Sequence, residues 1–466
     1  MYLYELKKVK DIAILWYWKE GKSTLRFLLE LWISEDNITI IDKNNIELEN
    51  KNINIISGEC YLENLGIYNL IFKSPWISPY KKEISQYRDK LTSQTEIFFK
   101  NYEWRTIWIT ATKGKSTVST LLYETLNNAE YNVKLVGNIG KPVFDEINLL
   151  DPKKYNYIIY ELSSYMLETC NPNCSIAVLW NIYTCHLDYH NDSFPIYEQA
   201  KLNILNNSDN ILISQEFNQY GQNIDNCKYF WLESNYSYSD NYFYKNNQEL
   251  FSSENLLLLW DHNKKNISCI VWILDIITEK YNHNSAWIFS KLISSLENTL
   301  KKFSGLPHRM EKIAKYQWII FIDDWISTTP ESTIEAIKTF WNQINTLFLW
   351  WWDYWFTQES YSLLKNAIEL YNIENIVLFP DTWLDIFNID REDKQYWDIF
   401  NFKYNKLNLN ILFTNKMSEA IKFSYINTWK DNICLMSCAA PSYSLWTGYE
   451  QKWEEFKTFI EKYKNK

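Results

Sequence analysis

The feature that most constrains the fold is an apolar strand that runs into a basic, hydroxyl-rich turn at the start of a helix. Residues 105–110 read RTIWIT, and KGKST follows at 113–117, where a helical stretch over 116–127 begins. Such a turn presents successive backbone N–H groups and a helix N-terminus to phosphate oxygens. The sequence therefore predicts an ATP-binding loop in an α/β domain.

The side chains of this loop have separate predicted tasks. Lys115 would pair with the β- and γ-phosphates, and Ser116 would ligate Mg²⁺. Ile109 occupies the position where the common Walker pattern has glycine, so only the shorter G-K-S core matches. The other predicted ATP contacts in the loop are Thr112, Lys113, Gly114 and Thr117.

The same G-K-S-T core occurs earlier, at residues 21–24, after the apolar stretch 11–15. Two interpretations are open. The core could be a second triphosphate loop, or the segment could form a Rossmann-type nucleotide site with the acidic end of strand 38–42 about twenty residues later. The position of that acid favours the Rossmann-type site.

Strands and helices alternate along the whole chain, which indicates parallel sheets covered on both faces. We expect an α/β fold with three domains: a Rossmann-like domain over 1–97, a central P-loop ATPase-type domain over 98–306 and a Rossmann-like domain over 307–466. The Asn/Tyr/Ser-rich stretch 206–255 is expected to be surface decoration of the central domain. The predicted strands are 11–15, 38–42, 69–73, 105–110, 157–162, 176–182, 318–323, 346–350, 375–379 and 432–436.

Composition excludes several classes of function. Lys and Arg number 47 against 57 Asp and Glu, a formal net charge of -10 without a basic block, which argues against a nucleic-acid partner. No run of about 18 uncharged apolar residues and no signal-peptide pattern occurs, so we expect a cytoplasmic protein without membrane insertion. The 8 scattered cysteines are expected to be free thiols.

Three polar residues follow the loop on later segments: Glu161 in YELSSYMLE, His186 in NIYTCHLDYH and Lys201 in YEQAKLNIL. Taken singly, each has an ordinary structural explanation, such as a helix cap, a buried histidine or a solvated lysine. Their occurrence together, in this order after a phosphate loop, indicates a catalytic cluster.

These motifs, with FSGLPHRME and SCAAPSYSLWTGYEQK further along, occur in the order and spacing of the Mur ligases, and the chain resembles that family over essentially its whole length. The resemblance is strongest to members that add D-glutamate to UDP-N-acetylmuramoyl-L-alanine through an acyl phosphate, in peptidoglycan precursor synthesis. It implies an ATP- and Mg²⁺-dependent amide ligase that acts as a monomer.

The resemblance also assigns residues. It gives Lys115, His186 and Lys201 catalytic roles, with Ser116, Glu161, His186 and a carbamoylated Lys201 around two metal ions. Asn266, Arg309 and Asp324 match positions around the nucleotide. The matches to substrate-binding positions are Trp18, Lys19, Glu20, Asp42, Lys43, Ser74, Asn138, Thr328, Ser442, Tyr443 and Tyr449.

The amino-acid pocket departs from the family pattern. Tyr354 and Ile326 stand where the family carries cations that would meet a substrate carboxylate, and Cys185 replaces an acid. The amino acid that is added therefore stays open between D-glutamate and another one. A folylpolyglutamate synthetase, which lacks the N-terminal domain, and a non-catalytic ATP-binding relative are the further alternatives.

Composition contains one anomaly: 9 glycines and 23 tryptophans, against roughly 33 glycines at average usage. Many tryptophans stand where the family has glycine, and an indole blocks both positive φ and close approach to phosphate. A membrane-interface cluster at 350–352 is the alternative. We expect most of these positions to be UGA codons that the organism reads as glycine. They are Trp16, Trp18, Trp32, Trp76, Trp108, Trp260, Trp318, Trp350, Trp351, Trp355, Trp429 and Trp453.

Overall fold

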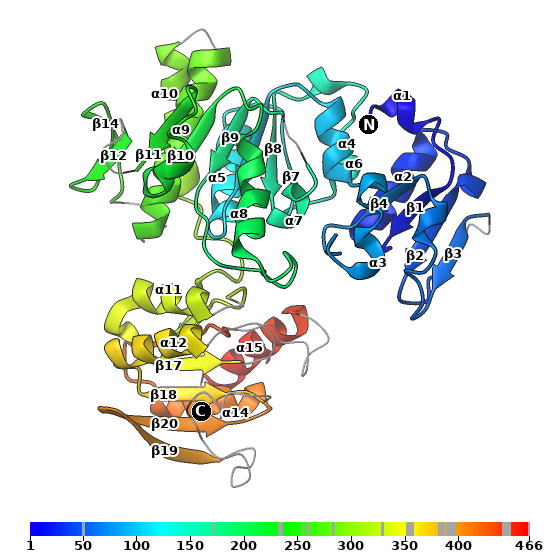
Figure 1. Cartoon of the computed structure of the whole chain (residues 1–466). Helices are drawn as coiled ribbons and strands as arrows, with labels where there is room; N and C mark the ends of the chain where they lie inside the picture. The colour runs from blue at the N-terminus through cyan, green and yellow to red at the C-terminus, as the bar shows by residue number, and fades with distance from the viewer. Residues whose placement is uncertain are drawn as a thin grey trace. The chain divides into compact units, whose positions relative to one another are not determined.

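The computed structural model divides into two compact units, Met1–Phe303 and Ser304–Lys466 (Figure 1). Each unit is built on parallel or mostly parallel sheets. The structure describes residues 1–48, 52–170, 173–231, 236–254, 256–257, 261–281, 285–327, 330–350, 358–380, 387, 398–439 and 449–464.

The first unit begins with a five-stranded parallel sheet in the order β3-β2-β1-β4-β5. The strands predicted at 11–15, 38–42 and 69–73 are confirmed. Every residue of β1, β2 and β4 is buried, in agreement with their mostly apolar sequences. The elements are α1 (Leu3–Leu6), β1 (Ile12–Leu15), α2 (Lys19–Glu30), β2 (Ile38–Asp42), β3 (Asn54–Ser57), β4 (Leu70–Lys73), α3 (Lys82–Ser85), β5 (Leu91–Thr92) and α4 (Gln94–Asn101).

The G-K-S-T core at 21–24 is not a phosphate loop. Helix α2 begins at Lys19, so the core lies inside the helix instead of in the turn before it. Gly21 is buried, and a Cβ there would collide with the Trp16 carbonyl. The glycine thus serves close packing of the helix on β1, and the structure excludes the second triphosphate loop.

The centre of the first unit is a six-stranded parallel sheet in the order β11-β10-β9-β6-β8-β7. Helices α5, α9 and α10 pack together beside it (Figure 1). The elements are β6 (Thr106–Thr110), α5 (Lys115–Asn128), β7 (Val133–Gly137), α6 (Val143–Glu146), β8 (Tyr157–Leu162), α7 (Ser164–Leu167), β9 (Ile176–Leu179), α8 (Phe194–Leu202), β10 (Ile211–Ser214), β11 (Cys227–Phe230), α9 (Asp261–Tyr281) and α10 (Ala286–Leu300).

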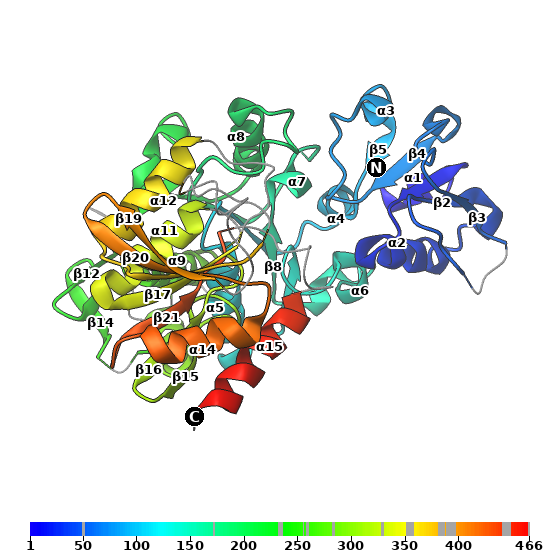
Figure 2. The ribbon, with the colours of Figure 1, turned by 90° about the horizontal axis from the view of Figure 1, so that it is seen from below.

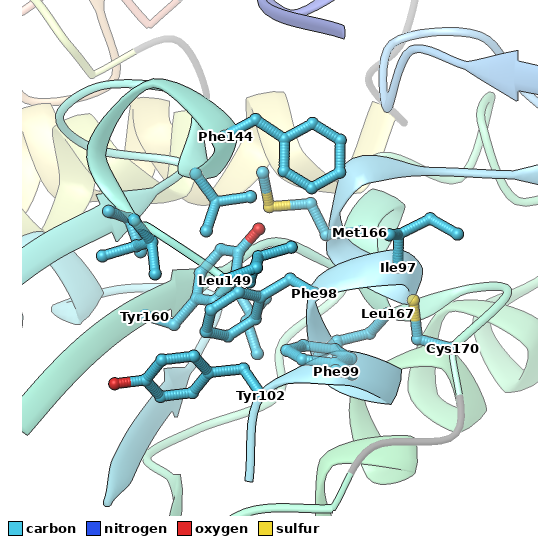
Figure 3. Close-up of a cluster of buried hydrophobic side chains, with 14 of the residues drawn as sticks. Ile97, Phe98, Phe99, Tyr102, Phe144, Leu149, Tyr160, Met166, Leu167 and Cys170 are labelled. Carbon is cyan, nitrogen blue, oxygen red and sulfur yellow. The ribbon is translucent and has the colours of Figure 1, made fainter. Parts of the chain in front are cut away.

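Aromatic side chains pack α4 against the opposite face of this sheet. Figure 3 shows Phe98, Phe99 and Tyr160 among the apolar side chains of one buried cluster. Phe99 stacks on Trp108 at 3.8 Å between ring centroids, and Phe98 meets Tyr160 edge-on at 5.3 Å. These contacts join the end of the N-terminal segment to strands β6 and β8.

The prediction that 206–255 is surface decoration is wrong for its first part. Strands β10 and β11 belong to the central sheet, and all four residues of β10 are buried. Only the later residues form a separate three-stranded antiparallel sheet, which contacts α9 through its first strand. The many Asn and Ser residues around the short apolar strand concealed it. The strands of that sheet are β12 (Tyr236–Ser239), β13 (Tyr242–Lys245) and β14 (Gln248–Ser252).

The second unit contains a seven-stranded sheet in the order β15-β16-β21-β17-β18-β20-β19. Its five inner strands are parallel, and the two edge strands run antiparallel to their neighbours. Helices α11 and α12 lie on one face, and α14 and α15 on the other (Figure 2). The elements are β15 (Glu311–Tyr316), β16 (Ile319–Asp323), α11 (Pro330–Phe340), β17 (Ile344–Leu349), α12 (Gln358–Leu370), β18 (Asn375–Leu378), β19 (Ile399–Tyr404), β20 (Leu407–Phe413), α14 (Met417–Asn427), β21 (Ile433–Met436) and α15 (Tyr449–Tyr463).

The α/β class is confirmed, and the strands predicted in the second unit are present. The domain boundaries at 97 and 306 stay a prediction. Among the described residues, no helix has the length and apolar character needed to cross a membrane.

Among the residues that the structure describes, five tryptophans adopt the left-handed backbone conformation: Trp16, Trp32, Trp231, Trp318 and Trp341, with φ from 48° to 78°. Two of these sites are local motifs that select glycine. Trp32 follows α2 at the C′ position of a Schellman motif, since its N–H donates to the Leu29 carbonyl and Ile33 N–H donates to the Leu28 carbonyl. Trp318 is the second residue of a two-residue hairpin turn with positive φ at both positions.

The backbone conformation at Trp32 leads to a prediction about the free energy of unfolding. Trp32 is 91% exposed, so its indole adds little packing while its φ of 63° strains the backbone. Trp32→Gly should therefore raise the free energy of unfolding by about 1 kcal/mol, measured by urea denaturation.

The matched control is Trp287→Gly, because Trp287 is also exposed but lies in α10. Glycine there should lower the free energy of unfolding by up to about 1 kcal/mol. Equal effects of the two substitutions would contradict the strain at Trp32.

Candidate active site

Strand β6 lies between β8 and β9, so the segments that follow these three strands meet at one edge of the sheet. The loop after β6 ends at Gly114, whose φ is +87°, and α5 begins at Lys115. A Cβ on Gly114 would lie 3.1 Å from Asn266 Oδ1. Glycine is therefore required both by the backbone conformation and by the close approach of α9.

Asn181, which the sequence analysis missed, fixes the shape of this loop. Its buried Oδ1 accepts hydrogen bonds from the backbone N–H groups of Thr112 and Lys113, each at 2.9 Å. Its Nδ2 donates to the Lys113 carbonyl at 3.1 Å. The only signal in the sequence is its place shortly after β9, which by itself does not distinguish it from other strand-end asparagines.

Glu161 is the centre of the candidate metal site. It lies on β8 and is fully buried. Its Oε1 accepts hydrogen bonds from Ser116 Oγ at 3.2 Å and from Asn138 Nδ2 at 2.8 Å. Its Oε2 is buried without a hydrogen-bond partner among the described residues. A carboxyl oxygen in this condition fits a cation, and the neighbouring hydroxyl is a second oxygen ligand of the kind Mg²⁺ uses.

Two lysine side chains contact the loop. Lys115 Nζ donates to the carbonyl of Ala111 at 2.8 Å and to that of Thr112 at 3.3 Å. Lys201 Nζ donates to the same Ala111 carbonyl at 2.8 Å from a buried position. Burial, and next the charge of Lys115, hold the pKa of Lys201 well below its usual range. The structure thus favours a neutral amine at position 201.

His186 follows β9 with φ 55°. Desolvation by the surrounding atoms, followed by the charge of Lys115, lowers its pKa to about 4, although part of the residue is exposed. The imidazole is therefore neutral at physiological pH and retains a lone pair for a metal ion. Its ring meets Tyr165 edge-on at 5.1 Å.

The remaining predicted ATP contacts of the first unit surround the loop. Thr112 Oγ1 lies 2.6 Å from Tyr197 Oη. Thr117 lies in the first turn of α5. Asn266 has a buried Oδ1 without a hydrogen-bond partner among the described residues, although its Nδ2 donates to Asn263. The free acceptor of Asn266 faces the glycine of the loop, as a nucleotide-binding residue would require.

The predicted residues for the uridine end gather after β1, β2 and β4, which are neighbours in the N-terminal sheet. The Asp42 carboxylate accepts hydrogen bonds from the N–H groups of Tyr17 and Asn44, which fixes the turns after β1 and β2. Ser74 N–H donates to the Leu15 carbonyl. The other members of the group are Trp18 and Lys43, both exposed, Lys19 in the first turn of α2, and Glu20, whose pKa burial raises to about 7.

Predicted residues of the second unit are described within that unit only. The Asp324 carboxylate is buried and accepts hydrogen bonds from Met310 N–H and from the hydroxyls of Ser327 and Ser437. Burial raises its pKa to about 6. Arg309 lies in the turn before β15, and Ile326 is exposed. Thr328, Ser442, Tyr443 and Tyr354 lie outside the described residues, as does the side chain of Tyr449, the first residue of α15.

Comparison with known proteins points to the family that the sequence motifs resemble. A profile described as "Mur ligase middle domain" matches residues 109–274. A UDP-N-acetylmuramoylalanine--D-glutamate ligase of Clostridium botulinum (strain Kyoto / Type A2) is 26% identical over 475 residues, which cover 97% of each chain. The enzyme of the same name from Francisella tularensis subsp. novicida (strain U112) is 26% identical over 462 residues, covering 97% of this chain and 96% of that one.

Two solved structures share the fold over nearly the whole chain. The MurF ligase from Thermotoga maritima in complex with ADP has a TM-score of 0.55 at 13% identity and covers 99% of this chain and 98% of its own. The UDP-N-acetylmuramate-alanine ligase MurC from the same organism has a TM-score of 0.55 at 15% identity, covering 98% and 99%. These likenesses extend the fold comparison beyond the matched middle domain.

The role of Asn181 can be tested directly. Asn181→Ala removes the side chain that accepts from the Lys113 N–H and donates to the Lys113 carbonyl, whereas Thr112 N–H keeps the backbone carbonyl of Asn181 at 3.0 Å, so the loop should lose its shape at Lys113. Loss of two hydrogen bonds, about 2 kcal/mol together, predicts roughly 30-fold weaker ATP binding by calorimetry.

Asn210→Ala is the matched control, because Asn210 Nδ2 donates to the Ser175 carbonyl away from the loop. It should leave ATP affinity unchanged. Equal ATP affinity in the Asn181→Ala variant and the unaltered protein would contradict the assigned role.

Proposed function

We propose that this chain, a member of the Mur ligase family, is an ATP-dependent ligase that joins D-glutamate to UDP-N-acetylmuramoyl-L-alanine in peptidoglycan precursor synthesis. The observation that carries the proposal is the arrangement around Glu161, where Ser116 and Asn138 occupy one carboxylate oxygen and the other is left for a cation. Relatives named for this reaction match 97% of the chain.

The proposed reaction has two steps. A carboxylate oxygen of UDP-N-acetylmuramoyl-L-alanine attacks the γ-phosphorus of ATP, which forms an acyl phosphate and releases ADP. The amine of the incoming amino acid then attacks the acyl carbon, loses a proton, and expels inorganic phosphate. Mg²⁺, when bound, neutralises charge between the carboxylate and the phosphates.

The chain's own residues prepare these steps. The N–H groups at the start of α5, from Gly114 to Ser116, and the ammonium of Lys115 are the proposed phosphate donors, since the N–H groups of Thr112 and Lys113 already donate to Asn181. Ser116, Glu161 and neutral His186 are the proposed metal ligands. We propose that Asn138, which donates to Glu161, also contacts the muramoyl substrate.

Lys201 is the proposed site of a carbamate. A neutral amine adds to CO₂ and releases a proton, and the depressed pKa of Lys201 provides that amine. The product is an anionic oxygen ligand, whereas an ammonium at this position would repel the metal ion. Burial among Thr110 and Ala111 would protect the carbamate from water.

A second candidate function is addition of a different amino acid by the same chemistry. It is favoured by Tyr354 and Ile326, which replace two cations expected around a D-glutamate side chain. Lys416 and Lys430 are the cations of the second unit that could compensate.

We predict phosphate release when ATP, Mg²⁺ and UDP-N-acetylmuramoyl-L-alanine are combined with D-glutamate. The assay is repeated with a panel of other amino acids, and the product is identified by mass spectrometry. Turnover with another amino acid only would establish the second candidate. No turnover with any of them would remove the ligase proposal and leave a non-catalytic nucleotide-binding protein.

The matched variant for this assay is Lys201→Ala. It should lose activity almost completely, and a short-chain carboxylic acid should restore part of it by taking the place of the carbamate. Full activity of Lys201→Ala, or a complete loss that no carboxylic acid relieves, would contradict the carbamate.

We further propose that most of the unusual tryptophans are glycine in the protein that the organism makes, because its ribosomes read UGA as glycine. The support is the backbone at Trp16, Trp32, Trp231, Trp318 and Trp341, which takes the conformation that glycine prefers. Buried Trp108, Trp180 and Trp272 add indole N–H groups without a hydrogen-bond partner among the described residues.

The coding DNA tests this proposal. UGA is expected at the five positions with positive φ, and mass spectrometry of the protein from its own organism should find glycine there. UGG at Trp16, Trp32 and Trp318 would contradict it.

A further inference from the structure

Outside the site described above, a group of polar side chains centred on buried Glu168 and His190 joins the N-terminal sheet to the central sheet within the first unit. We call this group, Tyr80, Arg88, Ser164, Glu168 and His190, the Glu168 junction. The Glu168 side chain is 6% exposed and the His190 side chain 0%. Polar groups buried to this degree need partners, and each finds its partner on another segment of the chain.

Glu168 is the centre of the junction. Its Oε1 accepts hydrogen bonds from the Tyr80 hydroxyl and, at 3.4 Å, from Arg88 Nη2. Its Oε2 lies 3.0 Å from His190 Nδ1, and His190 Nε2 lies 3.0 Å from Ser164 Oγ. The Arg88 guanidinium also lies over the Tyr80 ring at 4.3 Å. One carboxylate thus connects side chains from three separate segments.

Each of those segments carries a residue of the proposed site. Tyr80 comes six residues after Ser74, in the turn that follows β4. Ser164 comes three residues after Glu161 on β8. His190 comes four residues after His186, following β9. The junction therefore connects the turn assigned to the UDP-linked substrate with both segments assigned to metal ions.

Tyr189 extends the same connection towards the metal site. Lys73 Nζ donates to the Tyr189 hydroxyl at 2.9 Å, and Ser78 Oγ donates to the Tyr189 carbonyl at 2.6 Å. The Tyr189 ring stacks on Tyr165 at 3.9 Å, and Tyr165 contacts His186. A displacement of the turn after β4 would therefore be transmitted to the His186 segment.

Two simpler explanations account for less of the geometry. The order Ser–His–Glu is that of a hydrolase triad, but Ser164 is 3% exposed, so no substrate reaches its hydroxyl. Buried charge pairs are also weak sources of net stability, because desolvation offsets their attraction. All of these contacts are explained if the group aligns the segments that follow β4, β8 and β9.

We propose that Glu168, His190 and Tyr80 are positioning residues that hold the turn after β4 in register with Glu161 and His186. The inference rests on the proposed function, in which the substrate carboxylate must meet the γ-phosphate at the metal site. Rates of such steps depend on alignment, and a displacement of about 1 Å lowers them on the order of 100-fold.

The test uses Tyr80→Phe, which removes one hydroxyl and keeps the ring. The KM for UDP-N-acetylmuramoyl-L-alanine should rise about tenfold, as expected for loss of a hydrogen bond to a charged group, while the KM for ATP should change less than twofold. Tyr102→Phe is the control, because its hydroxyl donates to the Pro152 carbonyl elsewhere in the unit, and both KM values should stay unchanged.

A double-variant cycle with Glu168→Gln adds a second criterion. The effects of Tyr80→Phe and Glu168→Gln on the KM for the UDP-linked substrate should be less than multiplicative when combined, because both act through one contact. Multiplicative effects, unchanged KM values for Tyr80→Phe, or equal changes in both KM values would overturn the proposal.

Amide hydrogen exchange separates this inference from the proposed function, since it needs no turnover. In Tyr80→Phe, exchange should rise both at 74–80 and at 186–190. A rise confined to 74–80 would overturn the inference even in an active ligase. Loss of turnover in the unaltered protein would count against the proposed function only.

Discussion

The placement of β6 between β8 and β9 is the constraint on which the rest of the site depends. Parallel pairing in one register brings the ends of the three strands to the same edge of the sheet. The phosphate loop, Glu161 and the His186 segment follow from that order alone. The side chain of Asn181 then fixes the shape of the phosphate loop, because its amide forms hydrogen bonds with two N–H groups and one carbonyl of the loop.

Two amines and a carboxyl group lie close together at this edge. Lys115 and Lys201 share the Ala111 carbonyl, and the Glu161 side chain is buried near them. Desolvation and the charge of Lys115 lower the pKa of His186, so its imidazole adds no positive charge.

The sequence predicts local features well and long-range ones poorly. The strand–loop–helix at 105–127 and the strands with unbroken apolar sequences are confirmed because their signals are contained in a few adjacent residues. The core at 21–24 was ambiguous because the start of α2 at Lys19 depends on packing against β1. Asn181, β10 and the Glu168 junction were missed because their importance comes from partners many residues away.

The tryptophans with positive φ show that strand pairing and helix capping determine the backbone conformation more strongly than the side chain does. A left-handed residue with a Cβ costs about 1–2 kcal/mol, which is less than the hydrogen bonds that a strand ladder or a Schellman motif supplies in combination. The turn at Trp318 is fixed by the pairing of Tyr316 with Ile319, and the end of α2 by the bond from Ile33 to Leu28. The backbone therefore keeps the geometry that suits glycine even though the sequence places tryptophan there.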